Sequence, residues 1–548
     1  MTKYVMVTGG VMSGIGKGVT TASIGKLFQF RNYDVEVIKI DPYLNVDPGT
    51  LNPVEHGEVY ITEEVWEFRP VKGFKLTISE IDQDFGTYER FLGKFISPEQ
   101  NITSGQIYLT VILQERRGEF LGRTIQIIPH ITDEIKRRIR GVAEKKKPDI
   151  LLIEVGGTVG DIEAMPFLEA IRQFRLEEGK GNTALVHVTY VPFLETVQQQ
   201  KSKPTQHSVR TLQGMGLQPD IIVCRSEEPL SEDVRRKLSL YCNVPPEAVI
   251  SNPNMEVIYK LPLLFEEQRL GEYLCKILSL PPRKPSLEKW SRLVSLYENA
   301  RETVRIAMPG KYTQIVDSYI SINEAIRHAA ASLGAKPSIE WIDTTSFEED
   351  PGSVEVLENF DGILLTPGFG MRGVEGMILS AEYAIERRIP YLGICFGGQL
   401  LFVAFCRSIL GLKNANSSEV NPSAPHLVVD LLPEQRKLRN KGGTMRLGGH
   451  KVYLVRGTKL WDAYKQDVVV ERFRHRYHII PEYARKAEEA GMKVSAYDET
   501  GRIINAIELE DGWIVGVQFH PEFKSRPDNP SPVYKAFIRE SLKRRKGG

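Results

Sequence analysis

Residues 4–40 read YVMVTGGVMSGIGKGVTTASIGKLFQFRNYDVEVIKI, and this stretch decides the fold that we expect for the first half of the chain. Tyr4–Thr8 is a short apolar run that ends at two glycines, as is typical of a buried strand. The pattern of Thr20–Phe30 favours a helix, and Val35–Ile40 favours a second strand. A strand, a glycine-rich turn, a helix and a strand form a βαβ unit, which predicts a parallel sheet covered on both faces.

The composition excludes several classes of protein. The chain has 548 residues, 71 Lys and Arg against 70 Asp and Glu, and five Cys. This balance disfavours a basic nucleic-acid-binding protein and an acidic disordered one, and five cysteines are too few for a disulfide framework. No apolar run approaches the roughly 20 residues that span a bilayer, and the N-terminus lacks the pattern of a signal peptide. We therefore expect a cytoplasmic protein whose partners are neither nucleic acid nor membrane.

A change in composition divides the chain. Residues 276–290 carry three prolines among basic residues, and strand and helix patterns restart at Val304–Met308. We predict an α/β protein with two doubly wound domains, at 1–275 and 301–545, and a linker at 276–300. Further buried strands are predicted at Ile150–Val155, Thr183–Val191 and Asp220–Cys224.

The turn after the first strand, GGVMSGIGKGVTTAS at 9–23, has the features of a phosphate-binding loop. The backbone N–H groups of such a loop cradle phosphate oxygens, and Lys17 is placed to reach the β- and γ-phosphates. The match to G-x-x-x-x-G-K-[ST] is imperfect, because Gly10 lies one residue too early and Gly18 replaces the hydroxyl that would bind magnesium. A glycine-rich turn of purely structural value is the alternative.

Carboxylates elsewhere are candidates for the missing metal ligand. Asp82 and Asp84 lie in EIDQDFG, and Glu154 ends an apolar strand, where a carboxylate faces the ligand crevice of an open sheet. Each of them is otherwise a solvated or capping residue. The polar stretch KSKPTQHS at 201–208 brings lysines that either contact phosphates or lie on the surface.

The second half contains the pattern of a thiol nucleophile. In IPYLGICFGGQLL, at 389–401, Gly-x-Cys-x-Gly joins a strand to a helix, as in a nucleophile elbow with cysteine in place of serine. The helix N-terminus favours the thiolate of Cys395, and the N–H of Phe396 is placed to stabilise an oxyanion. GVQFHPEF, at 516–523, offers His520 as base and Glu522 as orienting acid. The other cysteines are interpreted as core residues: Cys224, Cys242, Cys275 and Cys406.

These motifs carry a resemblance to known families. GICFGGQ with FHPEF is similar to the class I glutamine amidotransferases. The first half resembles the P-loop (Rossmann-like) amidoligase domain of the CTP synthases in GGVMSGIGKG, KIDPYLNVDPGT, EHGEVY, YERF, ERRGEFLG, EVGGTVGDIE, KPTQHSV and QPDIIVCR. The second half adds FGMRGVEGM, NANSSE, GGTMRLG and RHRY, and is expected to be a class I glutaminase domain.

The resemblance implies an activity and its partners. It implies ATP-dependent amination of UTP to CTP, the last step of de novo CTP synthesis, through a 4-phosphorylated UTP intermediate. The nitrogen would come from L-glutamine or from free ammonia, and His56 would mark the mouth of an enclosed route for ammonia. It also implies Mg²⁺ as cofactor, GTP as allosteric activator, CTP as feedback inhibitor, and a homotetramer that can form filaments.

The resemblance also implies roles for individual residues. The ATP site would contain Gly14, Ile15, Gly16, Lys17, Gly18, Val19, Lys39 and Asp84, with Asp84 and Glu154 as magnesium ligands. The site for UTP and CTP would contain Ser13, Asp161, Ile162, Glu163, Lys201, Ser202, Lys203, Pro204, Thr205, Gln206 and Lys237. Glutamine would be bound by Gly368, Phe396, Gly397, Gly398, Gln399, Glu419 and Arg476 around the catalytic Cys395, His520 and Glu522.

The chain departs from the family pattern in two places. The segment 61–86 is longer than its counterpart, and Val65–Phe68 and Phe74–Ile78 on either side of RPVKG predict an added β-hairpin before Asp84. In the second place, Pro367 replaces a glycine of the usual P-G-G-F-G loop. Proline has no backbone N–H. If the oxyanion donor is the N–H of the residue at position 367, this donor is lost, and if it is the N–H of Gly368, the donor is kept.

Three other interpretations remain at this point. A cobyrinate-type amidoligase also joins a phosphate loop to a class I glutaminase, but KPTQHS and GTVGDIE argue against it. A non-catalytic filament-forming homologue is disfavoured by the intact Cys395, His520, Glu522, Lys17 and Glu154. A partitioning ATPase fused to a thiol hydrolase leaves the motifs between the two halves unexplained.

Overall fold

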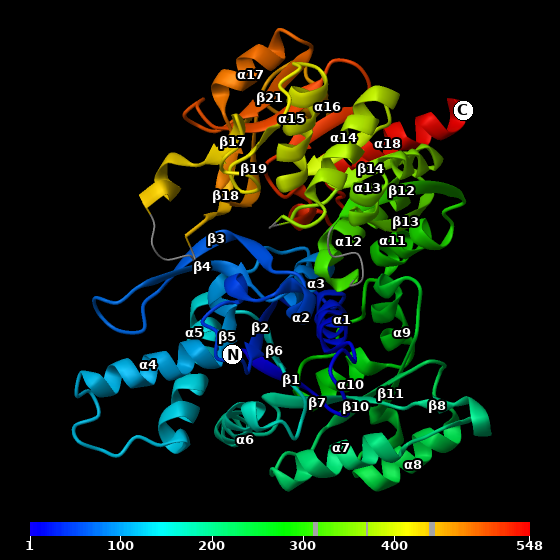
Figure 1. Cartoon of the computed structure of the whole chain (residues 1–548). Coiled ribbons are helices and arrows are strands. Elements are labelled where there is room, and N and C mark those ends of the chain that lie inside the picture. The colour runs from blue at the N-terminus through cyan, green and yellow to red at the C-terminus, as the bar shows by residue number, and fades with distance from the viewer. Residues whose placement is uncertain (311–315, 369–370, 438–443, 548) are drawn as a thin grey trace. The chain divides into compact units, whose positions relative to one another are not determined.

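The computed structural model describes residues 1–310, 316–368, 371–437 and 444–547. These residues form two compact units, one of Met1–Pro48 with Trp66–Ser295 and one of Gly49–Val65 with Leu296–Gly548 (Figure 1). The short segment Gly49–Val65 therefore folds with the C-terminal half of the chain. The boundaries 1–275, 276–300 and 301–545 stay a prediction.

The first unit is built on a parallel sheet. Its strand order is β11 (Val249–Pro253), β10 (Ile221–Ser226), β7 (Thr183–Tyr190), β1 (Lys3–Gly9), β6 (Ile150–Val155), β2 (Val35–Asp41) and β5 (Asn101–Thr103). The predicted βαβ unit is confirmed, with the helix α1 at Lys17–Gln29. It begins earlier than the apolar pattern suggested, because the glycine loop leads directly into its first turn.

Helices cover both faces of this sheet. The side chains of Leu151 and Ile153 share a core with α5 (Thr132–Lys146) and α6 (Met165–Glu178), whereas Leu152 points to the opposite face and meets α1 at Gly25. The alternation follows from the two-residue period of a strand. The remaining helices of this unit are α3 (Asp84–Leu92), α4 (Ser104–Arg116), α7 (Lys203–Gly214), α8 (Glu232–Cys242), α9 (Leu261–Glu267) and α10 (Leu270–Ile277), and α11 (Glu288–Glu298) follows them.

The added hairpin is confirmed. It consists of β3 (Tyr60–Phe68) and β4 (Leu76–Ile81), which pair with each other in a two-stranded sheet. The guanidinium of Arg138 lies 5.1 Å from the ring of Trp66 and 5.4 Å from that of Phe68, so the C-terminal end of β3, next to the turn, packs on α5. Strand β4 ends directly before Asp82.

The second unit has a larger, mixed sheet. Its order is β13 (Ala335–Asp343), β12 (Glu302–Gly310), β14 (Gly362–Leu365), β15 (Tyr391–Ile394), β23 (Ile514–Val517), β22 (Ile504–Leu509), β21 (Met492–Tyr497), β18 (Arg446–Leu454) and β19 (Val468–His475). The strands are parallel from β13 to β23 and antiparallel beyond. A small sheet adds β16 (Ala415–Ser417), β17 (His426–Leu431) and β20 (Tyr477–Ile479).

Helices also lie on both faces of the parallel part. One face packs against α14 (Val374–Arg387) and α15 (Phe396–Ser408), and the other against α12 (Ile320–Ser332) and α18 (Pro532–Gly547). The α/β, doubly wound prediction is thus confirmed for both units. None of the described helices is long and apolar enough to cross a membrane.

Candidate active sites

The cysteine predicted as nucleophile lies on a strained turn. Cys395 follows β15 and has φ 52° and ψ −103°, a conformation that costs a non-glycine residue about 1–3 kcal/mol. Its backbone N–H donates to the carbonyl of Val517 at 2.7 Å, which ties the turn to the neighbouring strand β23. A Cβ at Gly393 would lie 2.5 Å from the carbonyl oxygen of Gly397, so glycine is required where the strand meets α15. The turn is the predicted nucleophile elbow.

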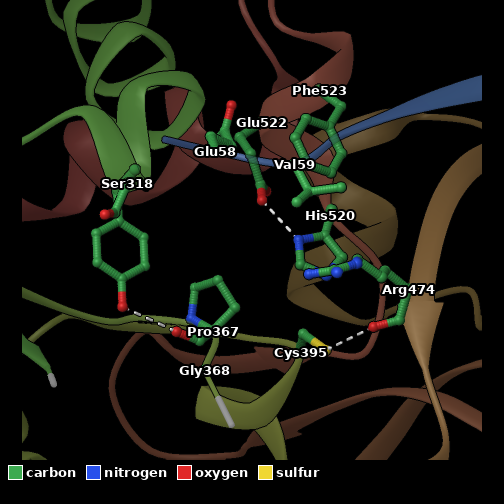
Figure 2. A pocket seen from close by; sticks show the side chains of 11 residues that line it. Glu58, Val59, Ser318, Pro367, Gly368, Cys395, Arg474, His520, Glu522 and Phe523 are labelled. Carbon is green, nitrogen blue, oxygen red and sulfur yellow. Dashed lines mark hydrogen bonds and ion pairs between the residues drawn. The ribbon is translucent and has the colours of Figure 1, made fainter. Parts of the chain in front are cut away.

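The sheet brings the other two predicted catalytic residues to the same place. Strands β15 and β23 are parallel neighbours with Ile394 opposite Val517, so the residues that follow both strands emerge at one edge. His520 Nδ1 lies 2.7 Å from Glu522 Oε1, and His520, Glu522 and Cys395 are all buried. Figure 2 shows this pair beside Cys395, whose thiol donates to the carbonyl of Arg474 at 3.6 Å.

The surroundings of His520 favour its charged form. Burial by itself lowers the pKa of the imidazole, but the Glu522 carboxylate and the sulfur of Cys395 outweigh it and raise the pKa to about 10. The imidazolium is therefore the main form at neutral pH. It is the form that can pair with a thiolate and later protonate a leaving amine.

This shift predicts a pH dependence of stability. Because the folded-state pKa of His520 lies above the ordinary value of 6.5, its stabilisation is complete below about pH 6.5 and is lost as the pH rises to about 10. The melting temperature of the wild type should exceed that of a His520→Asn variant by a margin that shrinks across this window. Scanning calorimetry between pH 6 and 10.5 measures the margin.

Cys395→Ala is the control for this measurement. It keeps the Glu522 carboxylate, whose charge is the largest single cause that raises the pKa of His520. Part of the pH dependence should therefore survive in that variant. A margin between the wild type and His520→Asn that stays constant over the whole pH range would contradict the assignment.

A pocket opens in front of the nucleophile. It is lined, besides the three catalytic candidates, by Glu58, Val59, Ser318, Tyr319, Pro367, Gly368, Arg474 and Phe523 (Figure 2). Glu58 and Val59 come from the segment that folds with this unit although it lies early in the chain. Six lining residues were not among the predicted site residues: Glu58, Val59, Ser318, Tyr319, Arg474 and Phe523. The motifs EHGEVY, RHRY and FHPEF contain four of them, whereas no motif of the sequence analysis contains Ser318 or Tyr319.

The predicted glutamine-binding residues are only partly in this pocket. Gly368 lines it, and Phe396 to Gly398 form the first turn of α15 behind Cys395. The side chain of Gln399 is buried and donates to the carbonyl of Tyr477 and to Gln518 Oε1, both at 3.0 Å. Neither Glu419 nor Arg476 lines the pocket, and Arg476 donates to Gln435 at 2.7 Å and to Thr444 at 2.9 Å.

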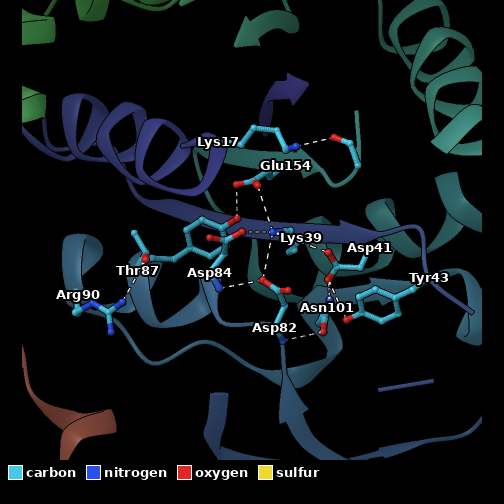
Figure 3. Close-up of polar contacts among 12 residues, drawn as sticks. Lys17, Lys39, Asp41, Tyr43, Asp82, Asp84, Thr87, Arg90, Asn101 and Glu154 are labelled. Atoms are coloured by element: carbon cyan, nitrogen blue, oxygen red, sulfur yellow. Dashed lines mark hydrogen bonds and ion pairs between the residues drawn. The ribbon is translucent and has the colours of Figure 1, made fainter. Parts of the chain in front are cut away.

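The first unit holds a cluster of charged side chains at the edge of its sheet. Lys39, on β2, lies opposite Glu154 of β6 in the strand register and is 5% exposed. Its ammonium lies 3.3 Å from Glu154, 3.2 Å from Asp82 and 3.9 Å from Asp41, and it also pairs with Asp84 (Figure 3). Four carboxylates thus surround a single ammonium group.

Burial and mutual repulsion disturb the ionisation of these groups. Burial raises the pKa of Asp41 to about 8, and it raises the pKa values of Asp82 and Glu154 as well, with neighbouring carboxylates adding to each shift. Burial opposes the charge of Lys39, but the carboxylates raise its pKa well above the usual value. A divalent cation beside these carboxylates would favour their ionised forms and so oppose the rise in their pKa values.

Lys17 of the phosphate loop lies next to this cluster. Its ammonium donates to the carbonyl of Gly157 at 2.6 Å, and burial lowers its pKa. A Cβ at Gly18 would collide with the carboxylate of Asp84, so this carboxylate fills the space where the loop pattern has a Ser or Thr side chain. Gly14 and Gly16 have φ of 72° and 84°, which glycine adopts without strain.

The predicted magnesium ligands fit such an ion. Asp84 and Glu154 offer hard oxygen donors beside the phosphate loop, and the buried Oε1 of Glu154 has the ion pair with Lys39 at 3.3 Å but no hydrogen bond within the described structure. Among the described residues, no group of three or more His, Cys, Asp or Glu side chains is arranged to hold a metal. Magnesium is commonly held by one or two carboxylates and completed by nucleotide phosphates.

The residues predicted to bind UTP and CTP follow neighbouring strands. Ser13 lies in the loop after β1, Asp161 to Glu163 follow β6, and Lys201 to Gln206 follow β7 and begin α7. Because β7, β1 and β6 are adjacent and parallel, these segments share one edge of the sheet. Lys237 is exposed on α8, which follows β10, the next strand outward.

Comparisons with known proteins find matches for both halves of the chain. Residues 3–280 match the family model described as the CTP synthase N-terminus, and residues 314–540 match that of the class I glutamine amidotransferases. The CTP synthase of Pyrococcus abyssi is 51% identical over 541 residues, which cover 98% of each chain. This chain belongs to the CTP synthase family. The CTP synthase of Thermococcus gammatolerans is 50% identical over 550 residues and covers all of each chain.

A solved structure also matches the second half. It is the glutaminase domain of Trypanosoma brucei CTPS with bound acivicin, 35% identical, which covers 44% of this chain and 94% of that chain with a TM-score of 0.42.

Pro367, a departure from the CTP synthase pattern, lies at the glutaminase pocket. Both Pro367 and Gly368 line it, and the carbonyl of Pro367 accepts a hydrogen bond from the hydroxyl of Tyr319 at 3.2 Å. The next two residues of the loop lie outside the described part of the chain. Proline has no N–H, so Gly368 is the residue of this pair with a backbone donor at the pocket.

Proposed function

We propose that the two sites carry the two halves of one reaction, with glutamine hydrolysis at Cys395 and amination of UTP at the cluster around Lys17 and Lys39. The chain, as a CTP synthase, converts UTP to CTP with ATP and glutamine. The observation that carries the proposal is the presence of both sites in one chain: a strained cysteine beside a His–Glu pair, and a phosphate loop beside a carboxylate cluster. Identity of 50–51% over the full length favours this activity over the amidoligase, scaffold and partitioning-ATPase alternatives.

The glutaminase step follows from the chemistry of the second site. The Cys395 thiolate attacks the side-chain amide carbon of glutamine, and the N–H groups of Phe396 and Gly368 stabilise the oxyanion. The His520 imidazolium, held by Glu522, gives its proton to the departing ammonia and then takes a proton from the water that hydrolyses the thioester. Ammonia and glutamate result, and Cys395 leaves the thioester as the thiolate.

The synthetase step uses positioning and charge neutralisation. We assign the ATP phosphates to the loop Gly14–Val19, where Lys17 and Lys39 compensate their charge. Magnesium, when bound to Asp84 and Glu154, would neutralise further charge on the transferred phosphoryl group. The C4 oxygen of UTP takes this phosphoryl group and becomes a leaving group that ammonia displaces. The segments after β6 and β7, together with Ser13 and Lys237, would bind UTP or inhibitory CTP.

Further properties come from the family resemblance and stay proposals. Ammonium is not nucleophilic, so ammonia needs an enclosed route, and His56 is its proposed mouth because Glu58 and Val59 just beyond it line the Cys395 pocket. The proposals that rest on this resemblance also include magnesium as cofactor, GTP as activator, CTP as inhibitor, a homotetramer that can form filaments, and a cytoplasmic location.

A spectrophotometric assay of CTP formation tests the function and the effect of Pro367 together. We expect the purified protein to form CTP from UTP and ATP with either glutamine or ammonia, with GTP stimulating only the glutamine reaction.

Comparable maximal rates with the two nitrogen sources would support Gly368 as the oxyanion donor. If the donor is lost, the glutamine reaction falls by about 10²–10³-fold, and Pro367→Gly restores it. Absence of CTP with both nitrogen sources would refute the function.

A further inference from the structure

The glutaminase site contains a polar side chain that the mechanism above does not use. Gln518 lies between β23 and His520, is 5% exposed, and donates a hydrogen bond from Nε2 to Sγ of Cys395 at 3.5 Å. Gln518 lines a small second cavity together with Cys395 and does not line the pocket in front of the nucleophile. Its amide therefore approaches the sulfur from this second cavity and not from the pocket.

The orientation of the Gln518 amide is determined by its neighbours. A backbone carbonyl only accepts hydrogen bonds, so the atom of Gln399 that lies 3.0 Å from the Tyr477 carbonyl must be its nitrogen. The same nitrogen lies 3.0 Å from Gln518, and the atom that accepts there must be the oxygen. The nitrogen of Gln518 is then the atom that faces the sulfur, and the contact to Cys395 is an N–H donor.

The two contacts of the sulfur respond differently to ionisation. The neutral thiol donates to the Arg474 carbonyl at 3.6 Å, and this bond cannot survive loss of the proton because both atoms are then acceptors. The Gln518 donor remains, and it is stronger toward a negatively charged acceptor. A donor that interacts better with the charged form favours that form.

We propose that Gln518 is a further functional residue of the glutaminase: its side-chain amide, held in place by Gln399, stabilises the Cys395 thiolate that attacks glutamine. The same donor stabilises the thiolate when it is expelled as the thioester is hydrolysed. Gln399 acts through Gln518 and is a positioning residue in this chain of contacts from the Tyr477 carbonyl.

The test compares thiolate formation in the full-length wild type and in Gln518→Met, which removes the donor but keeps an unbranched side chain of similar length. The rate of alkylation of Cys395 by iodoacetamide is measured against pH, and Cys395→Ala supplies the background from the other cysteines. We expect the midpoint of the profile to rise by about one pH unit or more. The kcat of the glutaminase should fall several-fold at pH 7 and recover at higher pH, whereas ammonia-dependent CTP formation should be unchanged.

Asn505→Leu is the matched control. Asn505 lines the same cavity and is fully buried, but its side-chain amide makes no hydrogen bond to the sulfur in the described structure. A general disturbance of the cavity would shift both profiles, and a shift in Gln518→Met alone supports the proposal. An unshifted profile in Gln518→Met would overturn it.

A second variant covers the case in which Gln518→Met does not fold. Gln518→Glu keeps an oxygen for the hydrogen bond from Gln399 and replaces the donor at the sulfur with an acceptor. The alkylation midpoint should rise at least as far as expected for the methionine variant. A midpoint equal to that of the wild type would overturn the proposal as well.

Discussion

Cys395→Ala is expected to abolish CTP formation from glutamine and to leave formation from ammonia close to the wild-type rate. The thiol forms the covalent bond to glutamine, and removing the nucleophile of such a triad lowers turnover by about 10³-fold or more. Cys395 lies in the unit that contains Gly49–Val65 and Leu296–Gly548, whereas Lys17, Lys39 and Glu154 belong to the other unit, which has its own core. The two steps should therefore be separable by mutation. Steady-state rates with glutamine and with ammonium chloride measure the effect.

Cys406→Ala is the control for this experiment. Cys406 is a fully buried core residue on α15, the helix that begins directly after Cys395. Burial raises the pKa of the Cys406 thiol to about 12. Its loss removes a small apolar group and should leave both nitrogen sources usable. Equal losses of the glutamine and ammonia reactions in Cys395→Ala would show that Cys395 serves the structure rather than the chemistry.

Glu154→Gln is expected to lower CTP formation by about 10²-fold or more with both nitrogen sources, while glutamine hydrolysis continues. The substitution keeps the shape of the side chain but removes the charge that we assign to magnesium, and this ion would neutralise charge developing on the phosphoryl group. The uncoupled reaction should be seen as glutamate release without CTP. Asp84→Asn should behave in the same way, because its carboxylate fills the place of the loop hydroxyl beside Gly18.

Asp82→Asn distinguishes a metal site from general disturbance of the cluster. Asp82 contacts Lys39 at 3.2 Å and accepts from the backbone N–H of Asp84 at 2.9 Å, so it supports the turn before α3. We expect a smaller loss than in Asp84→Asn, and magnesium titrations should show a raised requirement only in the Asp84 and Glu154 variants. Loss of magnesium-dependent turnover in Asp82→Asn alone would contradict the assignment of Asp84.

Much of the fold was predictable because its signals are local. The glycine loop, the short apolar strands and the Gly-x-Cys-x-Gly turn each place strong steric demands on a few consecutive residues, and the structure has strands and helices where these patterns indicate them. The hairpin before Asp84 was predictable for the same reason, since two β-prone runs flank a turn sequence. Its packing on Arg138 was not, because that contact joins residues far apart in the chain.

The amino-acid sequence by itself determined the two α/β units, the phosphate loop, the nucleophile and its His–Glu pair, and the resemblance to the CTP synthases. Only the tertiary structure decided that Gly49–Val65 folds with the C-terminal half and supplies Glu58 and Val59 to the pocket of Cys395. It also decided that Gln518 contacts the sulfur and that four carboxylates meet at Lys39. The physical reason is that strand patterns specify which residues end a strand, whereas the order of strands in the sheet specifies which ends meet.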